Sequence, residues 1–332
     1  MKKLKKIITF SALLSIAISS LAQEKGKVTV TTIYDEPKKN IWNVGIVLAG
    51  FDIQNQTSGG LYYMVHGRYT LGKLFTFTAN ASLDLTKLIG GDGIIKTGGV
   101  YTSLNPYSHF EGRASFHFSD REGKLTNKVK LGQGIENIGG VSHTVKYSTT
   151  YESKVRNIYA LTASINLHNQ TGVQVDDSAA DKRALTMTDA QGNDVGFKSQ
   201  SAVNQKNIII GVGLFIGYYT HFKGKFTGGT LGSKTRKIKK STSSAIELLI
   251  GTSMNMGNKV YWKDNNDVIQ TYNLKTAETK RLGWRITTDY GRNKVGLYQH
   301  FELGMRPGLF APSRQKSWLN QGYISVGYGF GF

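Results

Sequence analysis

The sequence predicts an all-β fold, a transmembrane up-and-down antiparallel β-barrel of about twelve strands. Three observations support this prediction. Apolar and polar residues alternate over long stretches. The 332-residue chain contains 39 Gly but only 4 Pro, a balance that favours strands and turns. After residue 23, no apolar run is long enough for a membrane-spanning helix. Ten to fourteen strands fit the same pattern.

The first 22 residues have the organisation of a secretory signal peptide. Four lysines lie among the first six residues, an apolar stretch covers residues 7–18, and Ser20-Leu21-Ala22 forms a cleavage site before Gln23. The apolar stretch is shorter than the ~20 residues that a spanning helix needs. We therefore expect the protein to be exported and the peptide to be removed.

Charge and cysteine content narrow the partners and the chemistry. The chain has 42 Lys and Arg against 22 Asp and Glu, and no Cys. The absence of Cys excludes a disulfide framework, a thiolate metal site and a cysteine nucleophile. A basic protein often binds nucleic acid, but an exported one does not meet the genome. We expect outer-membrane lipids, not nucleic acid, as the anionic partner.

Alternation is clearest in residues 107–119. There the apolar face holds Phe110, Gly112, Ala114, Phe116 and Phe118, and the polar face holds Glu111, Arg113, Ser115, His117 and Ser119. An exported β-sandwich would show the same alternation. Two features favour a membrane barrel: the strands exceed the ~5–6 residues usual in soluble sheets, and aromatic residues lie near the ends of their apolar faces.

The C-terminal strand is the most specific feature. Ile324, Val326, Tyr328, Phe330 and the terminal Phe332 lie on one face, opposite a serine and three glycines. This strand resembles the last strand of Gram-negative outer-membrane β-barrel proteins, and no narrower family is indicated. The resemblance implies that Tyr328, Phe330 and Phe332 form an assembly signal, read by the outer-membrane assembly machinery. It also implies location in the cell outer membrane.

Twelve strands can be assigned by residue range. They are 41–53, 61–71, 74–87, 94–104, 107–119, 140–151, 155–168, 206–222, 243–256, 280–290, 294–306 and 321–332. With both termini in the periplasm, every second connection should be a short turn. Residues 152–154 satisfy this rule, and residues 120–139, 169–205, 257–279 and 307–320 are the expected outer loops. Residues 223–242 violate it, so either the flanking strands extend into them or the strand count is wrong there.

The predicted domains are the signal peptide 1–22, a periplasmic N-terminal extension 23–40 and the barrel 41–332. Within the extension, residues 28–34 alternate like a strand. This segment could add to the sheet edge of a partner protein, or it could be a flexible leader.

The polar strand faces should line the barrel lumen. The lumen-lining candidates are His66, Arg68, Glu111, Arg113, His117, Arg285, Glu302 and Arg306. Such residues either pair and fill the interior or form a constriction that selects ions. Because basic residues outnumber carboxylates, a pore built from them would favour anions.

A second group of charges forms a basic patch. It consists of Lys234, Arg236, Lys237, Lys239 and Lys240, in a stretch without carboxylates. The patch is a solvated strand end, or it binds an acidic partner or lipid phosphates.

No motif indicates a catalytic group, a metal site or a cofactor, so no enzyme activity is predicted. The sequence favours a narrow, anion-preferring pore for small solutes. A non-conducting structural or accessory barrel of an envelope or secretion complex is the main alternative. An outer-membrane lipid-modifying enzyme is a second alternative.

Overall fold

The computed structural model describes most of the chain. The described residues are 25–26, 28–54, 58–85, 107–174, 185–195, 201–228, 231–263, 266, 268–277, 279–292, 296–309 and 322–331. The predicted signal peptide, the predicted strand 94–104 and Phe332 lie outside them. No helix of the described part is long and apolar enough to cross a membrane.

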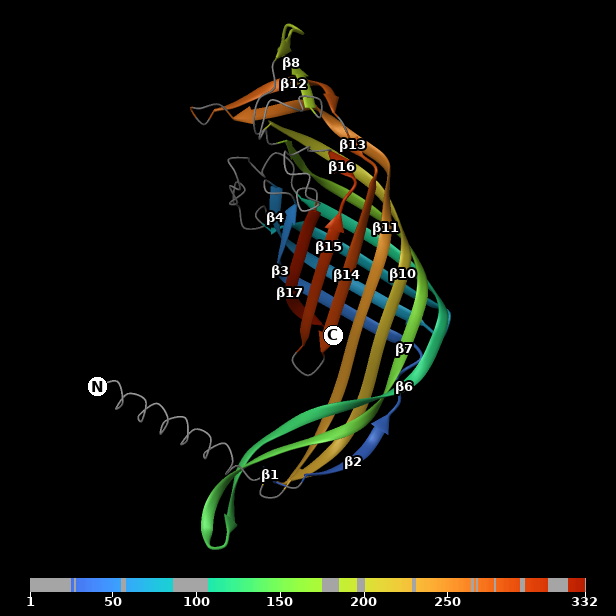
Figure 1. Ribbon diagram of the computed structural model, residues 1–332, viewed down its shortest axis with the longest axis vertical. Coiled ribbons are helices and arrows are strands. Elements are labelled where there is room, and N and C mark those ends of the chain that lie inside the picture. Colours follow the sequence, from blue (N-terminus) through green and yellow to red (C-terminus); the bar gives the residue numbers. More distant parts are fainter. Residues whose placement is uncertain are drawn as a thin grey trace, which may run out of the picture. The chain divides into compact units, whose positions relative to one another are not determined.

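These residues form seventeen strands (Figure 1). The strands are β1 (Lys25–Gly26), β2 (Val28–Asp35), β3 (Ile41–Gln54), β4 (Ser58–Leu71), β5 (Phe75–Asp84), β6 (Ser108–Ile138), β7 (Val141–Gln174), β8 (Leu185–Thr188), β9 (Asp194–Val195), β10 (Ser201–Gly228), β11 (Ser233–Lys263), β12 (Ile269–Ala277), β13 (Thr279–Lys280), β14 (Leu282–Arg292), β15 (Leu297–Met305), β16 (Gly308–Leu309) and β17 (Gly322–Gly331).

Ten of these strands form a closed ring. The order is β10-β7-β6-β5-β4-β3-β17-β15-β14-β11, and β11 pairs back with β10. The last strand also pairs with the first of the ring, since β17 runs antiparallel to β3 from Tyr323↔Gln54 to Gly331↔Gly45. The ring therefore has no open edge at the point where the two ends of the chain meet.

The strands of the ring expose apolar side chains and bury polar ones. On β6, Phe110 and Phe116 are exposed, whereas Glu111, Arg113 and Ser115 between them are buried. Strand β5 follows the same alternation, whereas β4 and β17 bury polar residues together with Tyr62, Met64 and Tyr323. This arrangement is the reverse of the usual soluble protein, in which charged residues are almost never fully buried.

The chain divides into two compact units. One unit consists of residues 38–122, 156–219 and 239–332 and contains the ring. The other, which we call the hairpin unit, consists of residues 1–37, 123–155 and 220–238. Strands β6, β7, β10 and β11 contribute residues to both units because they are 31, 34, 28 and 31 residues long.

The hairpin unit has an apolar core of its own. Its buried members are Val129, Leu131, Val145, Tyr147, Tyr151, Phe222, Phe226 and Ile238. They come from β6, β7, β10 and β11, and Val28 and Val30 of β2 pack against them. The rings of Tyr151 and Phe222 lie 4.4 Å apart. The core explains why this part of the four long strands stays folded as a β-structure.

A two-residue turn connects β6 to β7. Gly139 and Gly140 have φ angles of 62° and 84°. Two consecutive residues with positive φ form the type of turn that matches the twist of a hairpin, and glycine adopts these angles without strain. The Ser142 hydroxyl donates a hydrogen bond of 2.7 Å to the side-chain oxygen of Asn137 across the turn.

This hairpin changes the strand count. The expected outer loop 120–139 is the second half of β6 followed by the turn. The expected turn 152–154 lies inside β7, so the predicted strands 140–151 and 155–168 are one strand. This merger and the predicted strand 94–104, which lies outside the described residues, account for the difference between the ten strands of the described ring and the twelve that the sequence predicts. At residues 223–242 the first alternative holds, because β10 and β11 extend into them.

The other expected loops also contain strands. Within residues 169–205, β7 continues to Gln174, β10 starts at Ser201, and β8 and β9 lie between them. Within residues 257–279, β11 continues to Lys263 and pairs with β12. The N-terminal segment 28–34 is not a leader without structure, because it forms β2 and pairs with β10 of the same chain.

The pairing of β10 with β11, which closes the ring, depends on a glycine. A Cβ atom at Gly213 of β10 would lie 1.9 Å from the carbonyl oxygen of Ile246 and 2.8 Å from the Cα atom of Glu247. Any side chain there would push β10 and β11 apart at the pairing that closes the ring. Gly67 of β4 is a suitable comparison, since nothing lies within 4 Å of its Cβ position.

We predict that Gly213→Ala lowers the free energy of unfolding by about 2 kcal/mol or more, through overpacking against backbone that cannot move aside. Gly67→Ala should change it by less than about 0.5 kcal/mol. Urea unfolding of refolded protein in detergent micelles, followed by tryptophan fluorescence, measures both values. Equal effects of the two substitutions would contradict the close approach of β10 and β11.

Candidate functional site

The candidate site is a network of buried charges inside the ring. Arg68, Glu111, Arg113, Arg285 and Glu302 are each 5 % exposed or less. They lie on strands β4, β6, β14 and β15 at positions where alternation turns the side chain to the buried face. Charged groups at this depth need partners, because an isolated charge loses its hydration without compensation.

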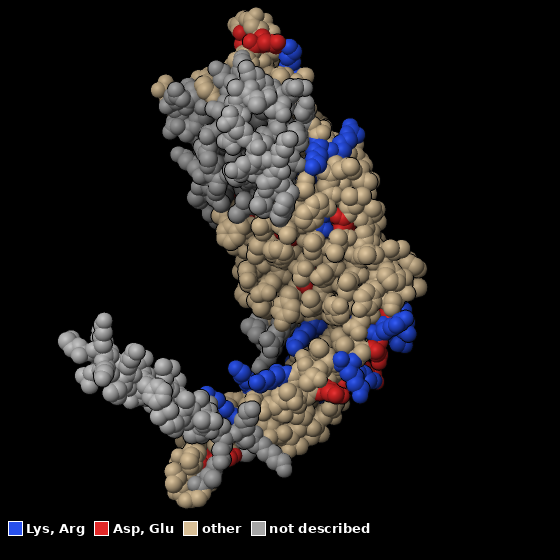
Figure 2. All heavy atoms as spheres, viewed as in Figure 1, with Lys and Arg blue, Asp and Glu red and all other residues tan. Residues whose placement is uncertain are grey.

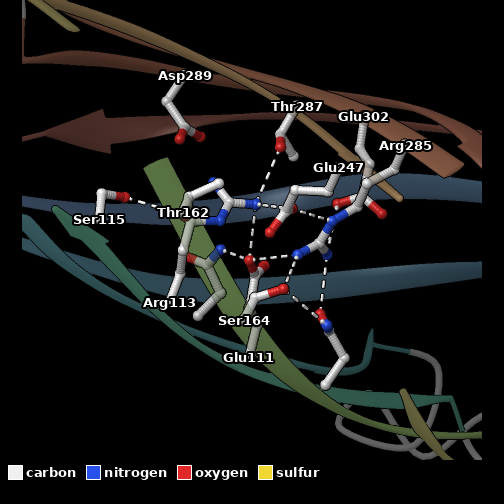
Figure 3. A network of polar contacts seen from close by, with 12 residues as sticks. Glu111, Arg113, Ser115, Thr162, Ser164, Glu247, Arg285, Thr287, Asp289 and Glu302 are labelled. Atoms are coloured by element: carbon white, nitrogen blue, oxygen red, sulfur yellow. Dashed lines mark hydrogen bonds and ion pairs between the residues drawn. The ribbon is translucent and has the colours of Figure 1, made fainter. Parts of the chain in front are cut away.

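Arg285 is the centre of the network (Figure 3). Its Nη2 atom lies 2.7 Å from Glu111 Oε1, and its Nε atom lies 2.6 Å from Glu247 Oε2. Nη1 donates to the side-chain oxygen of Asn166 at 2.8 Å, and Nη2 donates to Ser164 Oγ at 3.1 Å. All three guanidinium nitrogens therefore have acceptors, which makes burial of this side chain tolerable.

Arg113 completes a compact group of two cations and two carboxylates. Its Nη2 atom lies 2.7 Å from Glu111 and 2.9 Å from Glu247. It also donates to Thr287 Oγ1 at 3.0 Å. In Figure 3, Arg113 and Arg285 approach the same two carboxylates. Each carboxylate is thus shared by two guanidinium groups, and charge is balanced within the group.

The contacts of Arg285 with Glu111 and of Arg113 with Glu247 join strands that are not neighbours in the sheet, whereas Arg285 and Glu247 face each other on the paired strands β14 and β11. Glu111 and Arg113 belong to β6, Glu247 to β11 and Arg285 to β14. Along the ring, β7 and β10 separate β6 from β11. The contacts therefore cross the space that the ring encloses, and their side chains are 2 % exposed or less. Around these residues, ion pairs fill the space inside the ring.

A second group surrounds Asp289 on β14. Its carboxylate lies 2.6 Å from Arg68 Nη2, accepts a hydrogen bond of 2.7 Å from the Tyr298 hydroxyl, and lies 2.9 Å from His300 Nδ1. The other ring nitrogen of His300 is 3.8 Å from Glu302. Because Arg68 belongs to β4, this group also crosses the ring.

A third group surrounds Arg306, directly after β15. Its Nη1 atom lies 2.7 Å from Asp52 Oδ2, and its Nη2 atom lies 3.4 Å from Glu302 Oε1. The guanidinium carbon is 3.6 Å from the centre of the Tyr323 ring, a cation–π contact. Glu302 accepts a further hydrogen bond from the Tyr323 hydroxyl. Arg306 thereby links β15, β3 and β17 near the closure of the ring.

Arg285 Nη1 lies 3.9 Å from Glu302 Oε2, so seven of the eight candidates from the sequence belong to one connected network. His66 is connected to the network through Asn80. The Asn80 side chain forms a hydrogen bond of 2.7 Å with His66 and donates one of 3.0 Å to Glu111. His117 stays apart, since its Nε2 atom contacts Thr76 Oγ1 at 2.9 Å. The structure buries all eight side chains.

Asp289 and His300, which are not among the eight candidates, lie on strand faces predicted to line the lumen, but sequence reasoning missed Asp52 and Glu247. With them, the network holds four arginines, Arg68, Arg113, Arg285 and Arg306, against five carboxylates, Asp52, Glu111, Glu247, Asp289 and Glu302. The basic surplus expected for the interior is therefore absent from this network. The sequence around Glu247 shows no alternation, because apolar residues precede and follow it; in the structure, Ile246 and Leu248 beside it are exposed.

Arg156 forms a separate contact in the unit that contains the ring. Its guanidinium group lies 2.6 Å from the Asp120 carboxylate and donates to the backbone carbonyls of Lys38 and Lys39 at 2.9 Å and 2.6 Å. It also donates to the carbonyl of Gly72 in the turn between β4 and β5. One side chain therefore fixes the entry to β3, that turn and β6.

The basic patch and the assembly signal lie elsewhere. Lys234 and Lys237 are exposed on β11, and Arg236, Lys239 and Lys240 are partly exposed. On β17, Tyr328 and Phe330 are 58 % and 51 % exposed on the outer face.

The described residues offer no metal site, since no three of their His, Asp or Glu side chains are grouped to hold an ion. A scan against known protein families finds no match to this chain, and a search of curated proteins also finds none. The geometry alone therefore carries the functional argument.

Arg285→Met should lower the free energy of unfolding by about 3–5 kcal/mol, because it leaves buried carboxylates without their cation. Arg281→Met is the matched control: Arg281 is exposed on the same segment, so we expect a change below about 0.5 kcal/mol. The double variant Arg285→Met/Glu247→Gln should recover part of the loss. Denaturant titrations give all three values, and equal losses for both single variants would disprove the role of the network.

Proposed function

We propose that this chain is an outer-membrane β-barrel with a closed interior, and that it acts as a non-conducting structural or accessory barrel of an envelope complex. The observation that carries the proposal is the set of ion pairs from Arg113 and Arg285 that cross the ring with side chains 2 % exposed or less. The non-conducting barrel is the alternative that the sequence places second.

The exposed face of the ring supports a membrane location. Leu161, Ile165, Leu214, Ile246 and Leu248 are 51–58 % exposed, on β7, β10 and β11. Figure 2 shows a wide, mainly uncharged surface over the ring strands. An exposed apolar surface of this kind is costly in water but favourable in a lipid bilayer.

Aromatic side chains add to this support. Trp42 is 71 % exposed and stacks on Tyr69, with ring centres 4.2 Å apart. Phe118, Tyr218 and Tyr328 are also exposed on the ring strands. Amphipathic aromatic rings near strand ends are typical of the two interfaces of a membrane barrel. The expected partners remain outer-membrane lipids and the assembly machinery that would read the C-terminal strand.

The size of the ring and its charge balance argue for a closed interior. Barrels of about 8 strands are filled by their side chains, and those of 16–18 leave an aqueous channel. A ring of ten strands is close to the smaller class. The network contains no surplus of cations that would attract anions, so the anion-preferring pore has less support than the closed barrel.

The membrane location predicts an unusual response to a surface mutation. Leu214→Arg, on β10 at 53 % exposure, should cost about 2–4 kcal/mol of folding free energy in liposomes, because an arginine would enter the lipid. Leu125→Arg, at 43 % exposure in the hairpin unit, should cost less than about 0.5 kcal/mol. Small, equal costs would indicate that the ring surface is not in contact with lipid.

The closed interior predicts electrical silence. The mature protein, refolded and shown by circular dichroism to be rich in β-structure, should give no discrete conductance steps in planar bilayers. The double variant Arg113→Ala/Glu247→Ala removes both members of an ion pair that crosses the ring, so neither charge is left without its partner. We expect this variant to give conductance steps although the unmodified protein gives none. Discrete, anion-selective steps from the unmodified protein would reinstate the pore and overturn this proposal.

A further inference from the structure

The hairpin unit carries a large surplus of positive charge. Among its described side chains, ten are Lys or Arg and four are Asp or Glu. The ten cations are Lys124, Lys128, Lys130, Lys146, Lys154, Lys223, Lys225, Lys234, Arg236 and Lys237. Three of the four carboxylates already have partners: Asp35 accepts from the backbone of Lys154, Glu136 from the Tyr147 hydroxyl, and Glu152 pairs with Lys124. Most of the positive charge therefore faces solvent.

On β6 the cations follow one face of the strand. Lys124, Lys128 and Lys130 are exposed, whereas Val129 and Leu131 are buried in the core of the unit. Positions two apart on a strand point to the same side, so Lys128 and Lys130 are neighbours on the outer face. The core residues hold this register, because a slip by one position would bury the lysines.

The same part of β6 is an edge of the sheet. Strand β5 pairs with β6 only as far as Phe75↔Phe116, and one further backbone hydrogen bond joins His117 N to the Leu74 carbonyl. Strand β7 lies on the other side of β6. From Gly123 to Leu131, β6 thus has no second neighbour among the described strands. An edge of this kind presents backbone N–H and C=O groups to another chain.

The lysines determine which chain can use this edge. Positive side chains along an edge oppose pairing between two copies of the same strand. They attract a strand that carries Glu or Asp at the facing positions, since opposite charges in cross-strand pairs stabilise a sheet. An anionic lipid headgroup could bind the lysine side chains, but only a polypeptide can also form hydrogen bonds with the row of backbone donors and acceptors along the edge.

We propose that the β6 edge from Gly123 to Leu131 binds an extended acidic segment of another protein, which adds to the sheet as a further strand. Main-chain hydrogen bonds supply affinity, and Lys128 and Lys130 select acidic side chains. The segment is a partner of the hairpin unit. The inference goes beyond the closed barrel and does not depend on it, because binding can be measured in detergent solution without a bilayer.

The test uses the full mature chain refolded in zwitterionic detergent micelles. The probe is a short fluorescent peptide in which Glu alternates with Val and Thr. We expect saturable binding by fluorescence anisotropy and slower hydrogen exchange of backbone amides within residues 123–131. The variant Lys128→Glu/Lys130→Glu should weaken binding about tenfold or more, because two attractive cross-strand pairs become repulsive.

Two controls separate strand addition from general charge attraction. The variant Lys223→Glu/Lys225→Glu makes the same charge change on exposed positions of β10, whose edge is covered by β2, and should weaken binding less than about threefold. A peptide of the same charge with Pro in place of Val should not bind, because proline cannot donate to the ladder.

Three results would overturn the proposal. They are no saturable binding of the alternating peptide, equal losses from the two double variants, and equal binding of the proline peptide. Binding of anionic lipid vesicles with the same dependence on Lys128 and Lys130, without protection of the β6 amides, would assign the surface to lipid instead. Because all these readouts are made in solution, their failure leaves the conductance and liposome results unaffected.

Discussion

The ion pairs of Arg285 with Glu111 and Glu247 are the interaction on which the rest of the ring depends. A ring of ten strands whose outer face is apolar must turn its polar side chains inward. Burying charges costs several kcal/mol for each ion, and well-placed partners offset that cost. Arg285 meets this requirement with all three of its nitrogens, and its partners come from strands on different sides of the ring.

Charge is distributed unevenly over the molecule, and the network inside the ring differs in charge from the hairpin unit. The network inside the ring contains four arginines against five carboxylates, so its charge is nearly balanced. The hairpin unit has ten cations against four carboxylates. The net charge of +20 therefore says little about what passes through the ring. The described side chains of the hairpin unit contribute +6 of it, on a solvent-facing surface.

Sequence reasoning located the polar faces well and the strand boundaries less well. Of the network, Asp52 and Glu247 escaped notice; Glu247 follows Ile246 and precedes two leucines, so the segment resembles a uniformly apolar strand. The glycines at 139 and 140 are a hairpin signal between two alternating stretches. The predicted outer loop ended at Gly139, and the predicted turn 152–154 divided β7 in two, which added one strand to the count.

The sequence by itself determined which side of each strand is polar, because a period of two residues is a local property of extended backbone. Only the tertiary structure decided which polar groups meet. Arg113 and Glu247 are 134 positions apart, and Arg285 and Glu111 are 174 apart. Such contacts follow from ring closure and strand order, which no local pattern encodes. The tertiary structure also decided the open edge of β6. Because β5 begins at Phe75, which pairs with Phe116, it covers only the first part of β6.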